Sequence, residues 1–477
     1  MGGSAVEAEP GSFRDPDGRV FIADGSVRRA LSPRGASDWQ ALRESPVIDE
    51  LVGEGSLVAT TEVDASGAPG ILVGETAAVL EHERIPFISW PYEWTFGMLQ
   101  DAALLQLSLI DRAIAAGLML KDATPYNVQW RGAQPVFVDV GSFEPLRKGE
   151  PWAGYRQFCM LYLYPRMLQA YKNVPFQPWL RGSVDGITPA EAAGIFASGK
   201  DKRRKGVFGH VRMHNRLEQR YSETRGREVQ KDLGSAGFST ELITNNVRKL
   251  QKLIRGLTYE GGTTQWTEYG TVSSGETVNT YTDADREVKD SFVSRAAARR
   301  HRSLVWDVGA NDARYSLLAL PHADYVVAVD ADLQTADRVY HQMKSQGQDR
   351  ILTLTGNVTD PSPSLGWRNR ERASFEERMN PDLILALAVV HHISIAGNVP
   401  LAEVIRWLAG FRSSMVVEFP TREDPMVRSL IAAKREGIHD DYDLPAFEAV
   451  LEECFTVTER EETPSGTRIL YEVEPRG

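Results

Sequence analysis

Two carboxylates and a glycine in the last part of the sequence have the spacing of a nucleotide-type cofactor site. Residues 303–315, SLVWDVGANDARY, read as an apolar strand, a turn from Asp307 through Gly309 to Asn311, and the start of a helix. A ligand can approach the backbone closely at Gly309 because glycine has no β-carbon. A second apolar run ends at Asp330, where a carboxylate can bind both hydroxyls of a ribose. The pairing of this turn with Asp330 is a stronger signal than the turn alone.

The same turn favours a methyl donor over a dinucleotide. A dinucleotide fingerprint has a third glycine that packs the helix N-terminus against a pyrophosphate, and this chain has Ala313 at that place. S-adenosylmethionine contains no pyrophosphate, so its site can dispense with that glycine. We therefore predict this cofactor, with Asp307 accepting hydrogen bonds near its methionine end.

Three further side chains could act on the acceptor of a methyl group. His391 and His392 follow the fourth predicted strand and Glu418 ends the fifth, at the edge where ligands lie in open parallel sheets. Methyl transfer is an in-line displacement, so a base is needed only if the acceptor must lose a proton. Each histidine is thus a candidate base or acceptor-positioning group, or simply caps the strand. Glu418 either orients the acceptor or satisfies nearby backbone groups.

A second set of polar residues occurs in the first third of the chain. Residues 120–141 read LKDATPYNVQWRGAQPVFVDVG, with Asp122 and Asn127 five apart and Asp139 beyond a pair of short strands. This segment resembles the catalytic and metal loops of the protein-kinase superfamily. That resemblance implies that Asp122 orients an attacking hydroxyl, while Asn127 and Asp139 hold Mg²⁺ under the phosphates of ATP.

Other parts of a kinase site are missing. Residues 1–120 contain no lysine and no Gly-rich phosphate loop, so Arg28 or Arg29 would have to replace the phosphate-anchoring lysine. Arginine is longer and planar, so the replacement is not equivalent. Three interpretations stay open: an active but unusual kinase, a pseudokinase that supports the other half of the chain, or a coincidental arrangement.

The elements that position these residues indicate two folded domains. Arg19–Ala23 and Ser26–Leu31 flank a hairpin turn at Asp24-Gly25, and apolar residues recur at helical spacing from Met98 to Ala116. From residue 281 onward, strand-like runs alternate with helices, which is typical of a parallel sheet covered on both faces. Five strands are predicted there: 304–308, 325–330, 351–355, 383–390 and 415–419.

We predict an α/β Rossmann-like methyltransferase domain with a mostly parallel seven-stranded sheet, preceded by an α+β kinase-like domain. The predicted boundaries are residues 1–182 for the kinase-like domain, 183–280 for a basic, largely helical connector, and 281–477 for the methyltransferase domain. A capping box at Thr282 and Asp285 marks the start of the last domain.

Residues 281–471 resemble class I S-adenosylmethionine-dependent methyltransferases, and in detail a family of rhizobial nodulation proteins. The segments that carry the resemblance are YTDADREVKDSFV at 281–293, WDVGAND at 306–312, DPSPSLGWRNRER at 360–372, LALAVVHHI at 385–393, NVPL at 398–401 and EFPTREDPMV at 418–427. The resemblance implies that the cofactor pocket contains Asp307, Gly309, Asn311 and Asp330, with Asn357 and Val358 near the adenine.

Composition and charge narrow the classes of partner. The apolar fraction of 42% and charged fraction of 25% are those of a globular protein, and two distant cysteines can build neither a disulfide framework nor a zinc cluster. No apolar run is long enough to span a membrane, and we expect a cytoplasmic protein.

The net charge of −11 makes nucleic acid an unlikely partner. Residues 199–255, however, hold 15 Lys or Arg against 6 Asp or Glu, which is either a solvated helical surface or a site for an anionic partner.

The expected function is methylation of a small molecule or glycan, on oxygen, with the kinase-like half supporting the fold or binding the acceptor. One alternative is a bifunctional kinase and methyltransferase that phosphorylates and methylates a saccharide, with ATP and Mg²⁺ as further cofactors. A second is a non-enzymatic protein that senses ligands. A third, methylation of nucleic acid, rests only on the basic segment.

Overall fold

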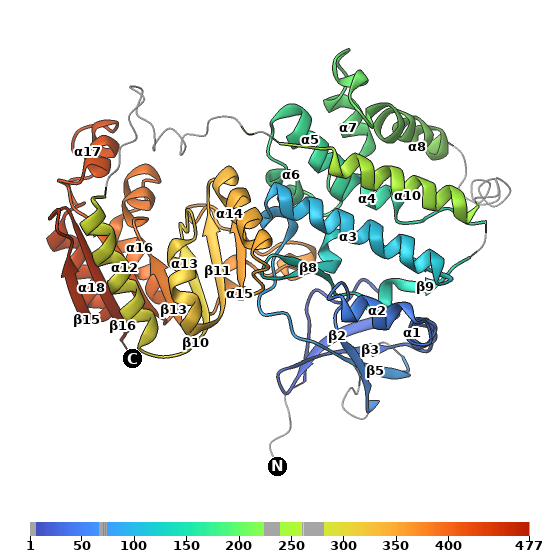
Figure 1. Cartoon of the computed structure of the whole chain (residues 1–477), viewed down its shortest axis with the longest axis horizontal. Coiled ribbons are helices and arrows are strands. Elements are labelled where there is room, and N and C mark those ends of the chain that lie inside the picture. The colour runs from blue at the N-terminus through green and yellow to red at the C-terminus, as the bar shows by residue number, and fades with distance from the viewer. Residues whose placement is uncertain are drawn as a thin grey trace. The chain divides into compact units, whose positions relative to one another are not determined.

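The chain forms two compact units in a computed structural model that describes residues 6–65, 70, 72, 74–147, 149–223, 239–259, 261 and 281–476 (Figure 1). Unit 1 consists of Met1–Trp130, Pro135–Glu260 and Ser364–Ala373. Unit 2 consists of Arg131–Gln134, Gly261–Pro363 and Ser374–Gly477. Residues 183–260, predicted as part of a separate connector, therefore belong to unit 1.

Unit 2 is built on a sheet that, within the described residues, has seven strands in the order β12-β11-β10-β13-β14-β16-β15. The first five strands of this order pair in parallel and are almost wholly buried, as expected for a sheet covered by helices on both faces. The last two run antiparallel to their neighbours. The strands are β10 (Arg302–Val308), β11 (Ala323–Asp330), β12 (Ile351–Thr355), β13 (Leu383–Ala386), β14 (Ser414–Pro420), β15 (Phe455–Glu462) and β16 (Arg468–Pro475).

The five strands predicted from the sequence of unit 2 are confirmed in position, with one correction. The fourth was expected to run from Leu383 to Val390 but ends at Ala386. The chain leaves the extended conformation because Ala388 has φ +55°. A π-helix, η10 (His392–Ala396), follows instead of further strand.

The first helix of unit 2, α12 (Asp283–Ala298), begins at a capping box. The predicted capping box is present: Thr282 Oγ1 accepts from the Asp285 amide at 3.1 Å, and Asp285 Oδ2 accepts from the Thr282 amide at 3.0 Å. The helices are α12 (Asp283–Ala298), α13 (Arg314–Ala319), η8 (Leu320–His322), α14 (Leu333–Ser345), α15 (Phe375–Arg378), α16 (Leu401–Gly410), α17 (Pro425–Ala432) and α18 (Leu444–Cys454).

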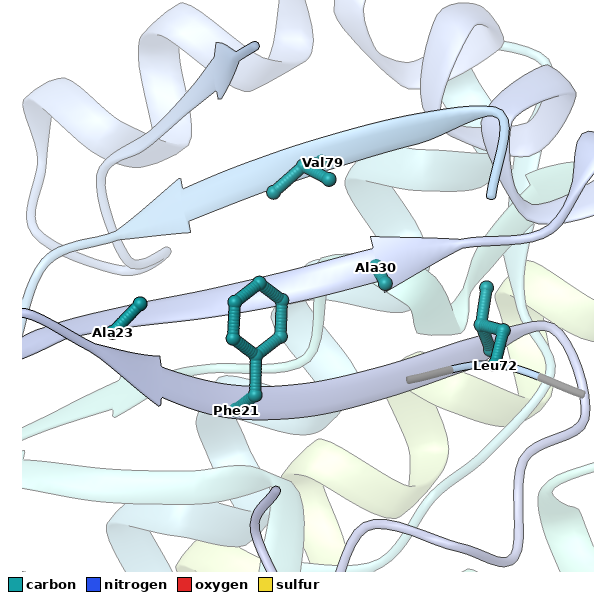
Figure 2. Packing of buried hydrophobic residues seen from close by; sticks show 5 residues of the cluster. All are labelled: Phe21, Ala23, Ala30, Leu72 and Val79. Atoms are coloured by element: carbon teal, nitrogen blue, oxygen red, sulfur yellow. The ribbon is translucent and has the colours of Figure 1, made fainter. Parts of the chain in front are cut away.

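Unit 1 begins with an antiparallel sheet of order β1-β2-β3-β5-β4 in its described residues. The predicted hairpin is confirmed, and Asp24 and Gly25 have the positive φ values, +51° and +79°, that its turn requires. Side chains at alternate positions pack on one face, as Figure 2 shows for Phe21 and Ala23 beside Val79. The strands are β1 (Glu7–Ala8), β2 (Gly18–Ala23), β3 (Ser26–Leu31), β4 (Thr60–Val63) and β5 (Ala78–His82).

The rest of unit 1 is mainly helical. The predicted helix at residues 98–116 is α3 (Phe96–Ala115), which lies beside α10 (Thr240–Arg255) (Figure 1). Two short strand pairs, β6 with β9 and β7 with β8, carry the segment that contains Asp122, Asn127 and Asp139. The remaining elements are α1 (Pro33–Arg43), α2 (Val47–Gly53), η2 (Pro91–Glu93), β6 (Leu118–Leu120), η3 (Pro125–Asn127), β7 (Val128–Arg131), β8 (Gln134–Phe137), η4 (Val140–Ser142), β9 (Phe143–Pro145), α4 (Tyr155–Phe158), η5 (Cys159–Leu163), α5 (Tyr164–Lys172), α6 (Gln177–Gly182), α7 (Pro189–Ile195), η6 (Asp201–Arg203), η7 (Val207–Met213), α8 (His214–Glu223) and η9 (Trp367–Asn369).

Candidate functional site

The turn after β10 leaves its backbone open at Gly309. This residue has φ +69°, a conformation that side chains rarely adopt, and a β-carbon built there would lie 3.3 Å from Val389 Cγ2. The amides of Gly309 and Ala310 both donate to the Val329 carbonyl, at 2.9 and 3.0 Å. These bonds fix the turn against the neighbouring strand β11 at the edge of the sheet.

The Asp330 carboxylate is held at the tip of β11 by two backbone amides. Its Oδ2 accepts from the Asn311 amide at 2.8 Å, and its Oδ1 accepts from the Asp332 amide at 2.8 Å. The structure therefore brings Asp330 into contact with the glycine turn. Burial raises the pKa of Asp330, and the amides of Asp332 and Asn311 oppose that shift. Each oxygen uses one lone pair in these bonds, which leaves acceptor capacity for two hydroxyl donors.

Asp307 lies deeper, inside the sheet edge. Its side chain is buried, and Oδ2 accepts a hydrogen bond from Ser316 Oγ at 2.6 Å. Burial raises its pKa to about 6, although the bond from Ser316 and the charge of Lys289 act in the opposite direction. Asp307 therefore titrates near neutral pH, where a small change in its surroundings alters its charge.

Asn357 and Val358 follow β12 at the same sheet edge. The Gly356 amide donates to the Asp330 carbonyl at 2.9 Å, which places this loop beside the tip of β11. Asn357 is exposed, and its Oδ1 accepts from the amide and the hydroxyl of Thr359, at 3.0 and 2.8 Å. Val358 is half-buried. An adenine contact by these two residues stays a prediction.

His391 and His392 lie side by side where the chain enters η10, with ring centroids 4.0 Å apart and ring planes tilted by 38°. Burial lowers the pKa of His391 well below its usual range, and the neighbouring charges of His392, Arg468 and Lys289 lower it further. Burial also lowers the pKa of His392 to about 4. Both rings are therefore neutral at physiological pH, and each can accept a hydrogen bond at one ring nitrogen.

Glu418 lies at the centre of a buried ionic cluster. Its carboxylate contacts Lys289 Nζ at 2.6 Å and Arg468 Nη1 at 3.0 Å, and it accepts from the Tyr281 hydroxyl at 2.8 Å. Arg468 also pairs with Asp424 at 2.8 Å. Burial alone would raise the pKa of Glu418, but the charges of Lys289 and Arg468 lower it, so the carboxylate is ionised. All of these partners are side chains within the protein, and a role of Glu418 toward the acceptor stays a prediction.

The three partners of Glu418 were not predicted from the sequence. Tyr281, Lys289 and Arg468 come from the start of α12 and from β16, far from Glu418 along the chain. One signal was available for Lys289. It falls on the same helical stripe as Asp285 and Phe292, and all three are buried. A lysine on the buried face of a helix requires an anionic partner, which points to an ionic cluster.

The three kinase-like residues of unit 1 are also brought together. Asn127 Nδ2 donates to Asp139 Oδ2 at 3.2 Å, and burial together with the charge of Asp139 raises the pKa of Asp122. Arg29, on β3, forms an ion pair with Asp139 Oδ1 at 2.7 Å. Arg28 pairs instead with Glu81 at 2.8 Å. Of the two arginines considered as substitutes for a lysine, Arg29 is therefore the one that reaches the acidic residues.

The described residues contain neither a metal-binding cluster nor a membrane-spanning helix. Within these ranges, no group of three or more His, Cys, Asp or Glu side chains is arranged to hold a metal ion. In the same residues, no helix combines the length and apolar character needed to cross a membrane.

The strand order of unit 2, with Gly309 and Asp330 at the carboxyl edge, defines the Rossmann-like fold of class I methyltransferases. Over 470 residues the chain is 32% identical to nodulation protein NoeA of Rhizobium meliloti (strain 1021), covering 97% of this chain and 95% of that protein. The chain therefore belongs to the NoeA family of nodulation proteins. No protein-family model matches it.

Solved structures similar to the chain include the N-methyltransferase NodS from Bradyrhizobium japonicum WM9, at 12% identity and a TM-score of 0.30, covering 41% of this chain and 98% of NodS. NodS in complex with S-adenosyl-L-homocysteine is 11% identical, with a TM-score of 0.31, and covers 42% of this chain and 95% of NodS. The PH0226 protein of Pyrococcus horikoshii OT3 is 12% identical, with a TM-score of 0.31, and covers 45% of this chain and all of that protein. The predicted nodulation-protein family is thus confirmed, and the kinase-like character of unit 1 stays a prediction.

Proposed function

We propose that the chain is an S-adenosylmethionine-dependent methyltransferase that acts on an oxygen of a small molecule or glycan. The observation that carries the proposal is the Asp330 carboxylate, oriented by the amides of Asn311 and Asp332 beside the open turn at Gly309. Two free acceptor positions on a half-buried carboxylate fit the two hydroxyls of a ribose. Asn357 and Val358 would border the adenine, and Asp307 would lie toward the methionine end.

The bound cofactor supplies an electrophilic methyl group, and the residues of unit 2 position the acceptor. The neutral rings of His391 and His392 suit a hydroxyl, because an uncharged ring nitrogen accepts the hydroxyl hydrogen bond, orients the oxygen and can take up the proton that methylation of this oxygen releases. Glu418 acts through Lys289 and Arg468 and is therefore a positioning residue.

Transfer of a labelled methyl group tests this proposal. Purified protein is incubated with cell extract and S-adenosylmethionine carrying a labelled methyl group, and the labelled product is identified. We expect wild type and Asp324→Ala to label the same compound and Asp330→Ala to label none. Asp324 is a matched control because it is exposed and lies at the other end of β11. Binding of the donor without labelling would favour a ligand sensor, and label removed by nuclease treatment would favour a nucleic-acid acceptor.

The raised pKa of Asp307 predicts how pH affects cofactor affinity. As the pH rises through about 6, the carboxyl group loses its proton and becomes an anion that attracts the sulfonium of S-adenosylmethionine. S-adenosylhomocysteine has the same amino acid and nucleoside parts but an uncharged sulfur. The ratio of the two affinities should therefore move severalfold toward S-adenosylmethionine between pH 5 and pH 7. Calorimetry across this range measures the ratio, and Asp307→Asn should make it independent of pH.

For unit 1 we propose a pseudokinase that supports the fold or binds acceptor, without ATP or Mg²⁺ as cofactors. The Arg29 guanidinium occupies one oxygen of Asp139, and Asn127 donates to the other. A magnesium ion would have to displace a cation that is already paired and mostly buried. This arrangement argues against the bifunctional alternative, in which Asn127 and Asp139 hold the metal.

A melting experiment distinguishes these two roles for unit 1. ATP with Mg²⁺ at millimolar concentration should leave the melting temperature of the wild-type protein unchanged, because a ligand stabilises only a state that binds it. A rise of several degrees that is absent from Asp139→Ala would instead establish a nucleotide site and favour the bifunctional enzyme. Asp49→Ala, which changes an exposed carboxylate on α2 of unit 1, is the control.

A further inference from the structure

A cavity of about 240 Å³ in unit 1 has one strongly basic wall. Five of its eight lining residues belong to the basic segment at residues 199–255, where the sequence left open either a solvated surface or a site for an anionic partner. Lys202, Arg212 and Arg216 line the cavity, and the opposite wall includes Ala193 and Phe196. The cavity is separate from the cofactor site, which belongs to unit 2.

Arg212 and Arg216 lie on a continuous helical segment, and Lys202 comes from η6 (Asp201–Arg203). The π-helix η7 ends at Met213 and α8 begins at His214, so Arg212 and Arg216 are a single turn apart. Asn215, between them, also faces the cavity and adds an amide that can donate or accept. Two arginines at this spacing repel each other unless an anion lies close to both.

The nearby carboxylates are engaged elsewhere. Glu218, on the same helix, forms an ion pair with Arg156, and Asp201 binds Lys172 Nζ at 2.6 Å. Among the described residues, no carboxylate forms an ion pair with any of the three cations of the cavity, Lys202, Arg212 or Arg216. The cavity thus combines three positive side chains with a chain whose net charge is −11. A local excess of positive charge raises the concentration of anions at the cavity.

The apolar wall restricts what kind of anion fits. Phe196 is buried and held by the ring of Tyr171, with centroids 6.4 Å apart, so it forms a fixed surface beside the cations. A ligand can therefore place its charge on the arginines and a compact organic part against Phe196 and Ala193. Ligand pockets for drug-sized molecules occupy roughly 300–1,000 Å³. A cavity of about 240 Å³ suits a smaller molecule.

We propose that this cavity binds a small phosphorylated molecule of the size of a sugar phosphate. A phosphate dianion matches three cations better than a single carboxylate does, and the planar guanidinium groups of Arg212 and Arg216 can each bind two of its oxygens. This site goes beyond the proposed methyl transfer and does not depend on it. It gives unit 1 a ligand of its own, at a place distinct from Asp122, Asn127 and Asp139.

Calorimetry with the full-length protein tests the site. The probes are glucose 6-phosphate and inorganic phosphate, with glucose as the uncharged control. We expect both phosphates to bind and glucose not to bind. The double variant Arg212→Gln/Arg216→Gln should weaken binding of glucose 6-phosphate at least tenfold. Arg203→Gln removes an exposed charge from the same segment but outside the cavity lining, and should change affinity less than twofold.

Several results would overturn this site. Equal weakening by Arg203→Gln and by the double variant would show a general effect of surface charge. Binding of a short RNA or of anionic phosphatidylglycerol vesicles, without binding of glucose 6-phosphate, would show a macromolecular surface. The absence of any heat with both phosphates would also contradict the proposal. Unchanged circular dichroism and melting temperature of the variants would show that lost binding is not a loss of folding.

Discussion

Replacing Asp330 by alanine should weaken S-adenosylmethionine binding by at least about a hundredfold. The proposed contacts are two hydrogen bonds from ribose hydroxyls to an ionised carboxylate, each worth roughly 1.5–3 kcal/mol. Losing both therefore costs on the order of 3–6 kcal/mol, or about 10² to 10⁴ in affinity. The substitution also releases the amides of Asn311 and Asp332, which the carboxylate holds at 2.8 Å. Calorimetric titration with S-adenosylmethionine and with S-adenosylhomocysteine measures the loss.

The control for this experiment is Asp324→Ala. Asp324 lies on the same strand, β11, and pairs at the surface with His301 at 2.7 Å. The same chemical change at that end of the strand should leave the affinities for S-adenosylmethionine and S-adenosylhomocysteine within about twofold of the wild-type values. Exposed ion pairs contribute little to stability. Equal affinities of wild type and Asp330→Ala would contradict the cofactor site, even if methyl transfer were later found by another route.

The cofactor site was predictable because its parts are local in sequence. A buried strand, a glycine turn and a following helix occupy neighbouring residues, and the next parallel strand must end at the same sheet edge. Asp330 and Asn311 are 19 residues apart; the spacing paired Asp330 with the glycine turn, and the family resemblance added Asn311. What the sequence could not supply is the direct bond from the Asn311 amide to the Asp330 carboxylate. That contact depends on φ +46° at Asn311.

Other features were unpredictable because their causes are distant. The segment Ser364–Ala373, which carries the GWRN motif, was assigned to the methyltransferase domain, yet it belongs to unit 1. Glu371 pairs there with Arg14 at 2.7 Å, and the Ala373 carbonyl accepts from Trp90 Nε1 at 3.0 Å. These partners are 357 and 283 residues away in the sequence, and no periodicity or spacing within the segment encodes them.

The ionic partners of Glu418 were not predicted for the same reason, and they lead to the prediction of largest effect on stability. Lys289 and Arg468 compensate the Glu418 carboxylate, and the side chains of all three are at most 3% exposed. Substitution of one partner in such a cluster leaves a buried charge without compensation, which costs roughly 3–5 kcal/mol. We therefore expect Glu418→Gln to destabilise unit 2 by about that amount. Hydrogen exchange at the amides of β14 measures the effect without a contribution from unit 1.

Two controls separate the ionic cluster from general effects of the substitution. Glu453→Gln removes an exposed partner of Arg406 and should cost less than about 1 kcal/mol. The double variant Glu418→Gln/Lys289→Met removes both members of the closest pair, so its cost should be clearly smaller than the sum of the two single costs. Additive costs would contradict a direct interaction between Lys289 and Glu418.

The pH dependence of the cluster has a defined sign. Because the folded-state pKa of Glu418 lies below its unfolded value, the carboxylate stabilises the fold above the unfolded pKa. This contribution is lost as the pH falls through the lowered pKa, when the folded state must also take up the proton. The difference in unfolding free energy between wild type and Glu418→Gln should accordingly be constant near neutral pH and shrink in acid. A difference that grows in acid would mean that Glu418 is protonated in the folded protein and that Lys289 and Arg468 do not hold it as an anion.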